Sequence, residues 1–104
     1  MNHDLVFSNF VLRPHERQLL SSGKVLPLGA RAFDVLRVLT QRAGDLVTKT
    51  ELFDQVWPGV VVEENNLQVH ISTLRKLVGA DHIATVAGRG YRFTGRIHQL
   101  AHAI

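Results

Sequence analysis

The pattern of hydrophobic and polar positions changes twice along this chain of 104 residues. Residues 1–28 contain short apolar runs, "VF", "FVLR", "RQLLS" and "KVLPL", which polar and turn-forming residues separate. Pro14 begins one break, and Ser22-Gly23 suits a two-residue hairpin loop between the last two runs. This spacing predicts short antiparallel strands at the start of the chain.

Helical spacing follows, and its first two segments lie between residues 29 and 58. The segment "GARAFDVLRVLTQRAG" carries an apolar stripe and ends at Gly44; the stripe consists of Ala32, Phe33, Leu36, Leu39 and Ala43. In "VTKTEL", Thr48 is expected to cap a second helix and Glu51 to complete a capping box. Pro58 marks the end of that helix, because proline cannot continue a helical hydrogen-bond pattern.

A third helix is predicted over residues 64–78, ending at Gly79. Its apolar stripe consists of Leu67, Ile71, Leu74 and Val78, and its opposite side carries Asn65, Gln68, Val69, Ser72, Thr73 and Lys76. That opposite side has no acidic residue. Small amides and hydroxyls can match the donors and acceptors of base edges, whereas an acid would be repelled by phosphates. The pattern indicates either a DNA-reading helix or a polar surface that happens to lack Glu and Asp.

The rest of the chain reads as strand, glycine turn and strand in "HIATVA", "GRG" and "YRFTGRI", which predicts a β-hairpin over residues 82–96. The predicted fold class is α+β: an N-terminal antiparallel four-stranded sheet, three helices that suggest a helix-turn-helix variant, and a C-terminal hairpin, which the family resemblance described below makes a winged helix-turn-helix. We expect one domain over residues 1–97, followed by a tail or linker at 98–104.

Composition and charge narrow the function. The chain is 45% apolar and 20% charged, which is typical of a folded protein, and without cysteine it holds neither disulfides nor thiolate zinc sites. No apolar run approaches the roughly 20 residues that span a bilayer, so we expect a cytoplasmic protein. Residues 65–104 carry five basic side chains against one acidic, while residues 1–64 carry seven against eight. The basic second half indicates a polyanionic partner.

Catalytic chemistry has little support in the sequence. His98 and His102 are four residues apart, but no third ligand joins them at metal-binding spacing. Glu63-Glu64 suits the positive end of a helix dipole better than an acid-base pair. There is no phosphate loop and no nucleophile motif. We expect neither an enzyme nor a bound metal or cofactor.

Three motifs resemble one known family. The run "VHISTLRKLVG", followed by "TVAGRGYRF", resembles the C-terminal signature of OmpR/PhoB-type winged-helix DNA-binding domains, and "LVTKTELFDQVW" resembles the segment leading into their second helix. The resemblance covers roughly residues 5–97. It implies sequence-specific binding of double-stranded DNA by a bacterial transcriptional regulator, with the third helix in the major groove and the hairpin, or wing, at the adjacent minor groove.

The resemblance also implies roles for individual residues. Base contacts are expected from Asn66, Gln68, Val69, Ser72 and Thr73. Phosphate contacts are expected from Asn65, His70, Arg75, Lys76 and Thr85. Three alternatives stay open: His70 either touches a phosphate or packs, the Arg75 and Lys76 pair is either a phosphate site or a solvated basic end of the helix, and Arg89 either enters the minor groove or is a solvated turn residue.

The sequence departs from the family pattern at two places that bear on DNA. A frequent arginine directly after "TV" is replaced by Ala87, with Arg89 two positions later. Ser72 and Thr73 stand where many relatives have basic residues, so the target sequence cannot be transferred. At the start of the first helix, Gly29 and Ala32 replace the usual hydroxyl cap and acid, which affects local stability only.

Partners follow from the resemblance as well. Tandem copies are expected on direct-repeat DNA sites, with a monomer when the domain is free. The loop at 57–64 is a candidate contact for RNA polymerase; Trp57 is expected to close the core, while the positions of Val60 to Val62 stay open. The alternative function is a winged-helix docking module that contacts polymerase or a partner domain without reading DNA.

Overall fold

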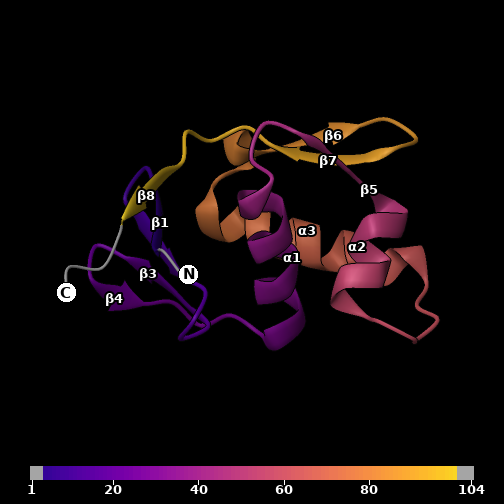
Figure 1. The fold of residues 1–104 in the computed structure, drawn as a ribbon, viewed down its shortest axis with the longest axis horizontal. Helices are drawn as coiled ribbons and strands as arrows, with labels where there is room; N and C mark the ends of the chain where they lie inside the picture. The colour runs from indigo at the N-terminus through magenta and orange to yellow at the C-terminus, as the bar shows by residue number, and fades with distance from the viewer. Residues whose placement is uncertain (1–3, 101–104) are drawn as a thin grey trace.

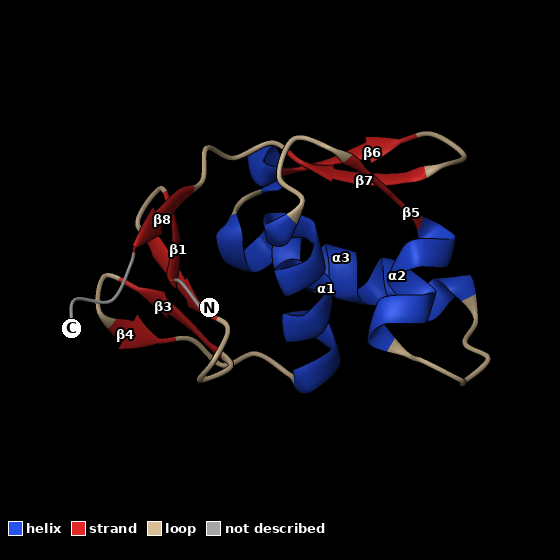
Figure 2. Ribbon diagram, viewed as in Figure 1, coloured by secondary structure: helices blue, strands red, loops and turns tan. Residues whose placement is uncertain are grey.

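The computed structural model describes residues 4–100, which form two antiparallel sheets and three α-helices (Figure 1, Figure 2). One sheet lies at one end of the molecule, and the other runs along the helices in the view of Figure 1. The strands are β1 (Asp4–Phe7), β2 (Phe10–Arg13), β3 (Gln18–Ser21), β4 (Lys24–Val25), β5 (Leu46–Thr48), β6 (Ile83–Val86), β7 (Gly90–Phe93) and β8 (His98–Leu100). The helices are α1 (Ala30–Gln41), α2 (Lys49–Val56), α3 (Glu64–Val78) and the short 3-10 helix η1 (Ala80–His82). The predicted order of sheet, three helices and hairpin is confirmed.

The N-terminal sheet contains one strand more than predicted. Its order is β4-β3-β2-β1-β8, so the four N-terminal strands form as expected and β8 adds to the free edge of β1. Residues 98–104 are predicted to be a tail or linker, but His98 lies opposite Val6 in an antiparallel pair. An edge strand offers unpaired N–H and C=O groups, which even a three-residue segment can satisfy. Residues 101–104 of that tail lie outside the described residues.

The three helices supply much of the hydrophobic core, and strands of both sheets add to it, for example through Phe7 and Phe93. α1 contacts both α2 and α3, and the predicted stripe residues Phe33, Leu36 and Leu39 are buried there. Thr48 caps α2 as predicted, because its hydroxyl accepts a hydrogen bond of 3.1 Å from the Glu51 N–H. The second half of the predicted capping box differs: the Glu51 carboxylate pairs with Arg42 at the end of α1. The cap therefore starts α2 and also ties it to α1.

The second sheet, in the order β5-β7-β6, carries the wing, which we define as β6, β7 and the turn between them. Gly88 has a φ of +74°, a conformation that glycine adopts without strain. Within the turn, the Arg89 N–H donates to the Val86 carbonyl at 3.0 Å. The Arg89 carbonyl in turn accepts from the Lys49 N–H at 3.1 Å. The tip of the wing is therefore fastened to the first residue of α2.

Candidate nucleic-acid interface

α3 separates its apolar and polar residues onto opposite sides, as predicted. Leu67, Ile71, Leu74 and Val78 are all buried against the core. The exposed residues between 65 and 76 form what we call the outer face, and they are Asn65, Asn66, Gln68, Val69, Ser72, Thr73 and Lys76. The outer face thus contains every base-contact candidate and no acidic residue, and the exposed Glu64 borders it one helical turn before Gln68.

A groove lies between α3 and the wing, with a volume of about 480 Å³. Its lining residues are Gln68, Ile71, Ser72, Arg75, Lys76, Ala80, Thr85 and Tyr91. The fold therefore brings three of the phosphate-contact candidates, Arg75, Lys76 and Thr85, into one hollow from two separate elements. Two positive charges border it, which makes the groove electropositive.

Arg75 has a structural role that the sequence does not reveal. Its Nε and Nη2 atoms donate to the Ile83 carbonyl at 3.1 and 2.9 Å, and Nη2 also donates to the Thr85 hydroxyl at 2.7 Å. A guanidinium has five N–H donors, so part of its capacity is used in joining α3 to β6. This half-buried residue also lines the groove and brings its positive charge to it. Arg75 both positions the wing and charges the groove.

His70 lies against Trp57, with 5.7 Å between the ring centroids. It is half-buried, and burial lowers its pKa below the usual 6.5. The imidazole is therefore neutral at neutral pH and adds no positive charge for a phosphate. Of the two alternatives for His70, this geometry favours packing.

Arg89 stands at the tip of the wing with an exposed side chain. The two backbone hydrogen bonds that fasten the turn hold its position, while Ala87 and Gly88 beside it are exposed and carry no charge. This arrangement projects a single cation from the tip of the hairpin. Such a projection suits either a narrow minor groove or a nearby phosphate.

A polar network at the start of α3 was not predicted. Lys49 Nζ pairs with Glu64 Oε2 at 2.7 Å, and Gln68 Nε2 donates to the same Glu64 oxygen at 3.2 Å. The hydrogen bond with Lys49 lowers the pKa of Glu64, and the hydrogen bond with Glu64 raises the pKa of Lys49. Both groups are thus charged at neutral pH. One residue of the outer face, Gln68, is held by a carboxylate before any ligand arrives.

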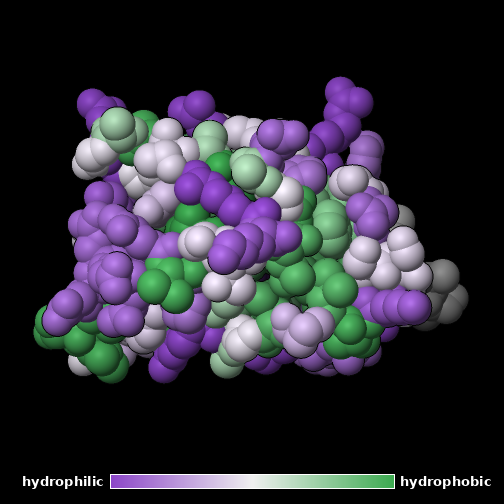
Figure 3. Space-filling model, turned by 180° about the vertical axis from the view of Figure 1, so that it is seen from behind, coloured by the Kyte–Doolittle hydropathy of each residue, from purple (hydrophilic) through white to green (hydrophobic). Residues whose placement is uncertain are grey.

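The α2–α3 loop, residues 57–64, has some side chains in the core and others exposed to solvent. Trp57 is 8% exposed and packs near Phe53, so it closes the core as expected. Val62 packs against the core, whereas Val60 is 58% exposed and Val61 fully so. In Figure 3, seen from behind, hydrophobic surface gathers at the lower corner farthest from the N-terminal sheet, where Figure 1 places this loop. The loop therefore presents two adjacent apolar side chains to solvent.

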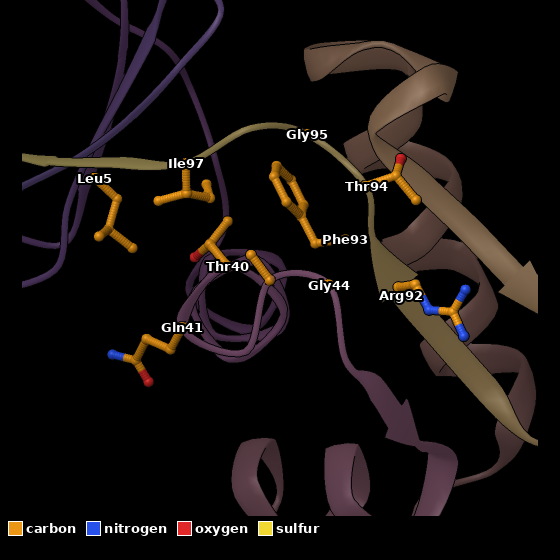
Figure 4. A pocket seen from close by; sticks show the side chains of 10 residues that line it. Leu5, Thr40, Gln41, Gly44, Arg92, Phe93, Thr94, Gly95 and Ile97 are labelled. Atoms are coloured by element: carbon orange, nitrogen blue, oxygen red, sulfur yellow. The ribbon is translucent and has the colours of Figure 1, made fainter.

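A second hollow lies between the end of α1 and the connection from β7 to β8 (Figure 4). It measures about 760 Å³ and is lined by Leu5, Thr40, Gln41, Ala43, Gly44, Arg92, Phe93, Thr94, Gly95 and Ile97. None of these residues is a candidate for DNA contact. The Thr40 hydroxyl, which is buried, donates to the Leu36 carbonyl of its own helix at 2.8 Å and so offers no waiting donor to a ligand. This hollow carries no recognisable chemistry.

Within residues 4–100, His, Asp and Glu side chains form no group of three or more that could hold a metal ion. Among the helices of this part of the chain, none is long and apolar enough to cross a bilayer.

Comparison with known proteins places the chain in a family. Residues 23–93 match the family described as "Transcriptional regulatory protein, C terminal". The transcriptional regulator HilA of Salmonella typhimurium (strain LT2) is 36% identical over 96 residues, which cover 88% of this chain but only 17% of HilA.

Two solved structures share the fold. The DNA-binding domain of E. coli CadC aligns with a TM-score of 0.81 and 27% identity over 93% of this chain and 96% of that one. The Klebsiella pneumoniae RstA DNA-binding domain, in complex with the RstA box, aligns with a TM-score of 0.74 and 28% identity over 88% of this chain and 96% of that one. The chain belongs to the family of transcriptional regulatory protein C-terminal domains.

Proposed function

We propose that this chain binds double-stranded DNA sequence-specifically, as the DNA-binding domain of a bacterial transcriptional regulator. α3 lies in the major groove and the wing reaches the adjacent minor groove. The observation that carries the proposal is the outer face of α3, seven exposed residues without an acid, beside a groove bordered by Arg75 and Lys76. The RstA domain, similar in fold and sequence, was solved in complex with the RstA box, which supports the same ligand class here.

Base reading is assigned to five residues of the outer face. Asn66, Gln68, Ser72 and Thr73 offer donors and acceptors of the size that reaches base edges. Val69, which is 52% exposed, suits the methyl group of thymine. An exposed valine in the middle of a polar helix face has an apolar contact to gain on binding.

Phosphate contacts are assigned to the two sides of the groove and to Asn65, which lies outside it in the first turn of α3. Arg75 and Lys76 supply charge from α3, and the Thr85 hydroxyl and the Asn65 amide supply neutral hydrogen bonds. His70 is the weakest of the phosphate candidates, because it is neutral and packed on Trp57. Arg89 is assigned to the minor groove.

Binding to DNA has a direct test in salt titration. The logarithm of the association constant should fall linearly with the logarithm of salt concentration, with a slope that counts the neutralised phosphates. Gln68→Ala and Thr73→Ala should each flatten base preference at one or two base pairs, at a cost of about 1–3 kcal/mol. A protein-docking module would show little duplex binding at any salt concentration, which would sink the proposal.

Exposed Val60 and Val61 favour a second partner. Two apolar side chains side by side on a loop suit a protein surface better than DNA, and we assign this loop to RNA polymerase. Replacing both valines with serine should leave DNA binding unchanged and lower transcription activation. A loss of DNA affinity in this variant would contradict the assignment.

We infer a monomer in the absence of DNA and tandem occupation of direct repeats, which sedimentation with and without a two-site duplex would test. A tight dimer without DNA would count against it. A protein that acts on the bacterial chromosome works in the cytoplasm, so the proposed function implies that location.

A further inference from the structure

Among the described contacts, Gln68 is the one residue of the outer face that donates a hydrogen bond to an acidic side chain. Glu64 lies one helical turn before it, and the Glu64 carboxylate accepts from Gln68 Nε2 at 3.2 Å. The same oxygen accepts from Lys49 Nζ at 2.7 Å, and Lys49 belongs to α2. Glu64 is thus held from a second helix while it holds Gln68.

This contact determines which way the Gln68 amide faces. The two ends of a glutamine amide are nearly alike in shape, so an isolated glutamine can turn either end outward. An ionised carboxylate can only accept hydrogen bonds. Glu64 is ionised at neutral pH, and the hydrogen bond from Lys49 lowers its pKa further below the usual 4.5. The amide nitrogen of Gln68 must therefore face Glu64, and the carbonyl oxygen faces away from it.

We infer that Glu64 is a positioning residue for DNA reading: it fixes the Gln68 amide so that one N–H and the carbonyl oxygen point outward together and select adenine. This inference rests on the proposed function. A glutamine reads adenine with two hydrogen bonds, accepting from N6 and donating to N7. One amide N–H is used by Glu64, and the second N–H with the carbonyl supplies that pair. Guanine presents two acceptors, O6 and N7, so the fixed carbonyl would oppose one of them.

Lys49 restrains the arrangement in the free domain. Its side chain is 29% exposed and its backbone N–H is bonded to the Arg89 carbonyl, so the side chain extends from a fixed backbone position. A lone exposed glutamate on a helix would sample several rotamers. With Lys49 in place, the Gln68 amide is oriented before DNA binds, which lowers the entropy that binding must remove.

Glu63 offers a matched control. It is the residue before Glu64, it is exposed, and its side chain makes no capping hydrogen bond. Glu63→Gln and Glu64→Gln remove the same charge at the same end of α3, and both should raise affinity for all duplexes to a similar extent. Only Glu64→Gln replaces a pure acceptor by a group that can also donate. The Gln68 amide is then free to turn.

The experiment is selection from random duplexes with the wild-type chain and four variants: Glu63→Gln, Glu64→Gln, Gln68→Ala and the double variant Glu64→Gln with Gln68→Ala. In the wild type and in Glu63→Gln, one base pair should show adenine preferred over guanine by on the order of tenfold or more. In Glu64→Gln that ratio should fall severalfold, with guanine gaining. In the Gln68→Ala background, Glu64→Gln should change nothing further.

Three results would distinguish a failure of the proposed function from a failure of the role inferred for Glu64. If the wild-type chain selects no duplex at all, the proposed function fails. If it selects a site but Glu64→Gln keeps the wild-type ratio of adenine to guanine, the positioning role of Glu64 fails alone. If Glu64→Gln changes base preference even without Gln68, then Glu64 contacts a base itself, and the inference is again overturned. Nuclear magnetic resonance of the free domain adds a readout without DNA: the Gln68 side-chain amide signal should move in Glu64→Gln and stay in Glu63→Gln.

Discussion

Gly90 lies so close to Val47 that a side chain does not fit between them: a Cβ added at Gly90 would stand 2.1 Å from the Val47 carbonyl oxygen. The two residues lie on the neighbouring strands β7 and β5, where Gly90 pairs with Thr48 and Tyr91 with Val47. The glycine is required by this close approach of two backbones and not by an unusual φ. The wing can lie against the start of α2 only because this position has no side chain.

Gly90→Ala should therefore displace the wing from β5. We expect loss of the hydrogen bond between Lys49 and Arg89, a lower midpoint of thermal unfolding, and weaker DNA binding. Gly29→Ala is the matched control, because a Cβ there meets nothing within 4 Å and Gly29 has a φ of −65°. Equal thermal unfolding of the two variants would mean that the wing tolerates the shift.

Arg75→Ala should have two effects, and Lys76→Ala should share only the first of them. Both variants should weaken binding to all duplexes and lower the salt slope by about one unit each, as for a lost phosphate contact. Arg75→Ala should also cost roughly 1–3 kcal/mol of the free energy of unfolding, because the Ile83 carbonyl and Thr85 hydroxyl lose their charged donor. Denaturant unfolding separates the two effects. An unchanged stability in Arg75→Ala would show that solvent replaces these hydrogen bonds without cost.

His70 should make stability depend on pH. Its pKa in the folded chain is lowered below 6.5 by burial, so the unfolded chain binds this proton more readily. The contribution is fully present above about pH 6.5 and is lost as the pH falls through the folded pKa. Between pH 7.5 and 5, wild type should lose more free energy of unfolding than His70→Gln. The other histidines are common to both proteins and cancel in the comparison, so parallel pH curves would contradict the shift.

Arg89→Ala should reduce affinity most for sites flanked by A·T steps. A narrow A·T-rich minor groove has an enhanced negative potential, which favours an inserted arginine. The preference set by α3 should stay the same. An equal loss for both kinds of flank would make Arg89 a general phosphate contact, and no loss would remove the wing tip from the interface. Fluorescence titration of paired duplexes that differ only in the flank measures this.

Local patterns predicted most of the fold. The stripe of Leu67, Ile71, Leu74 and Val78 follows the helical period, and all four residues are buried. The Thr48 cap depends on residues three apart in the chain, and it forms. The outer face follows from the same period, because residues opposite a buried stripe must face solvent. These features need only near neighbours in sequence.

What the sequence could not predict depends on distant pairs. Lys49 and Glu64 are separated by a whole helix and a loop, and nothing in "KTEL" or "EENN" marks them as partners. The Glu51 carboxylate could complete the capping box at Thr48 or pair with Arg42. It pairs with Arg42, because α1 packs close to α2. β8 is too short to show the alternation of apolar and polar residues that marks a strand, and it forms a strand because it pairs with the free edge of β1. Tertiary packing decides each of these cases.

Lys49 also fixes the distance between α3 and the tip of the wing, and therefore the distance along the DNA between the segments that they read. Its backbone holds the tip of the wing and its side chain holds the first turn of α3, so two groove-reading elements share one anchor residue. Each base pair inserted between the segments they read would move the flank by roughly 3.4 Å and turn it by roughly 35°. A single anchor leaves the protein little room to follow such a change. In an operator, the number of base pairs between the major-groove segment that α3 reads and the flank that the wing reads should therefore be as strictly specified as the bases themselves.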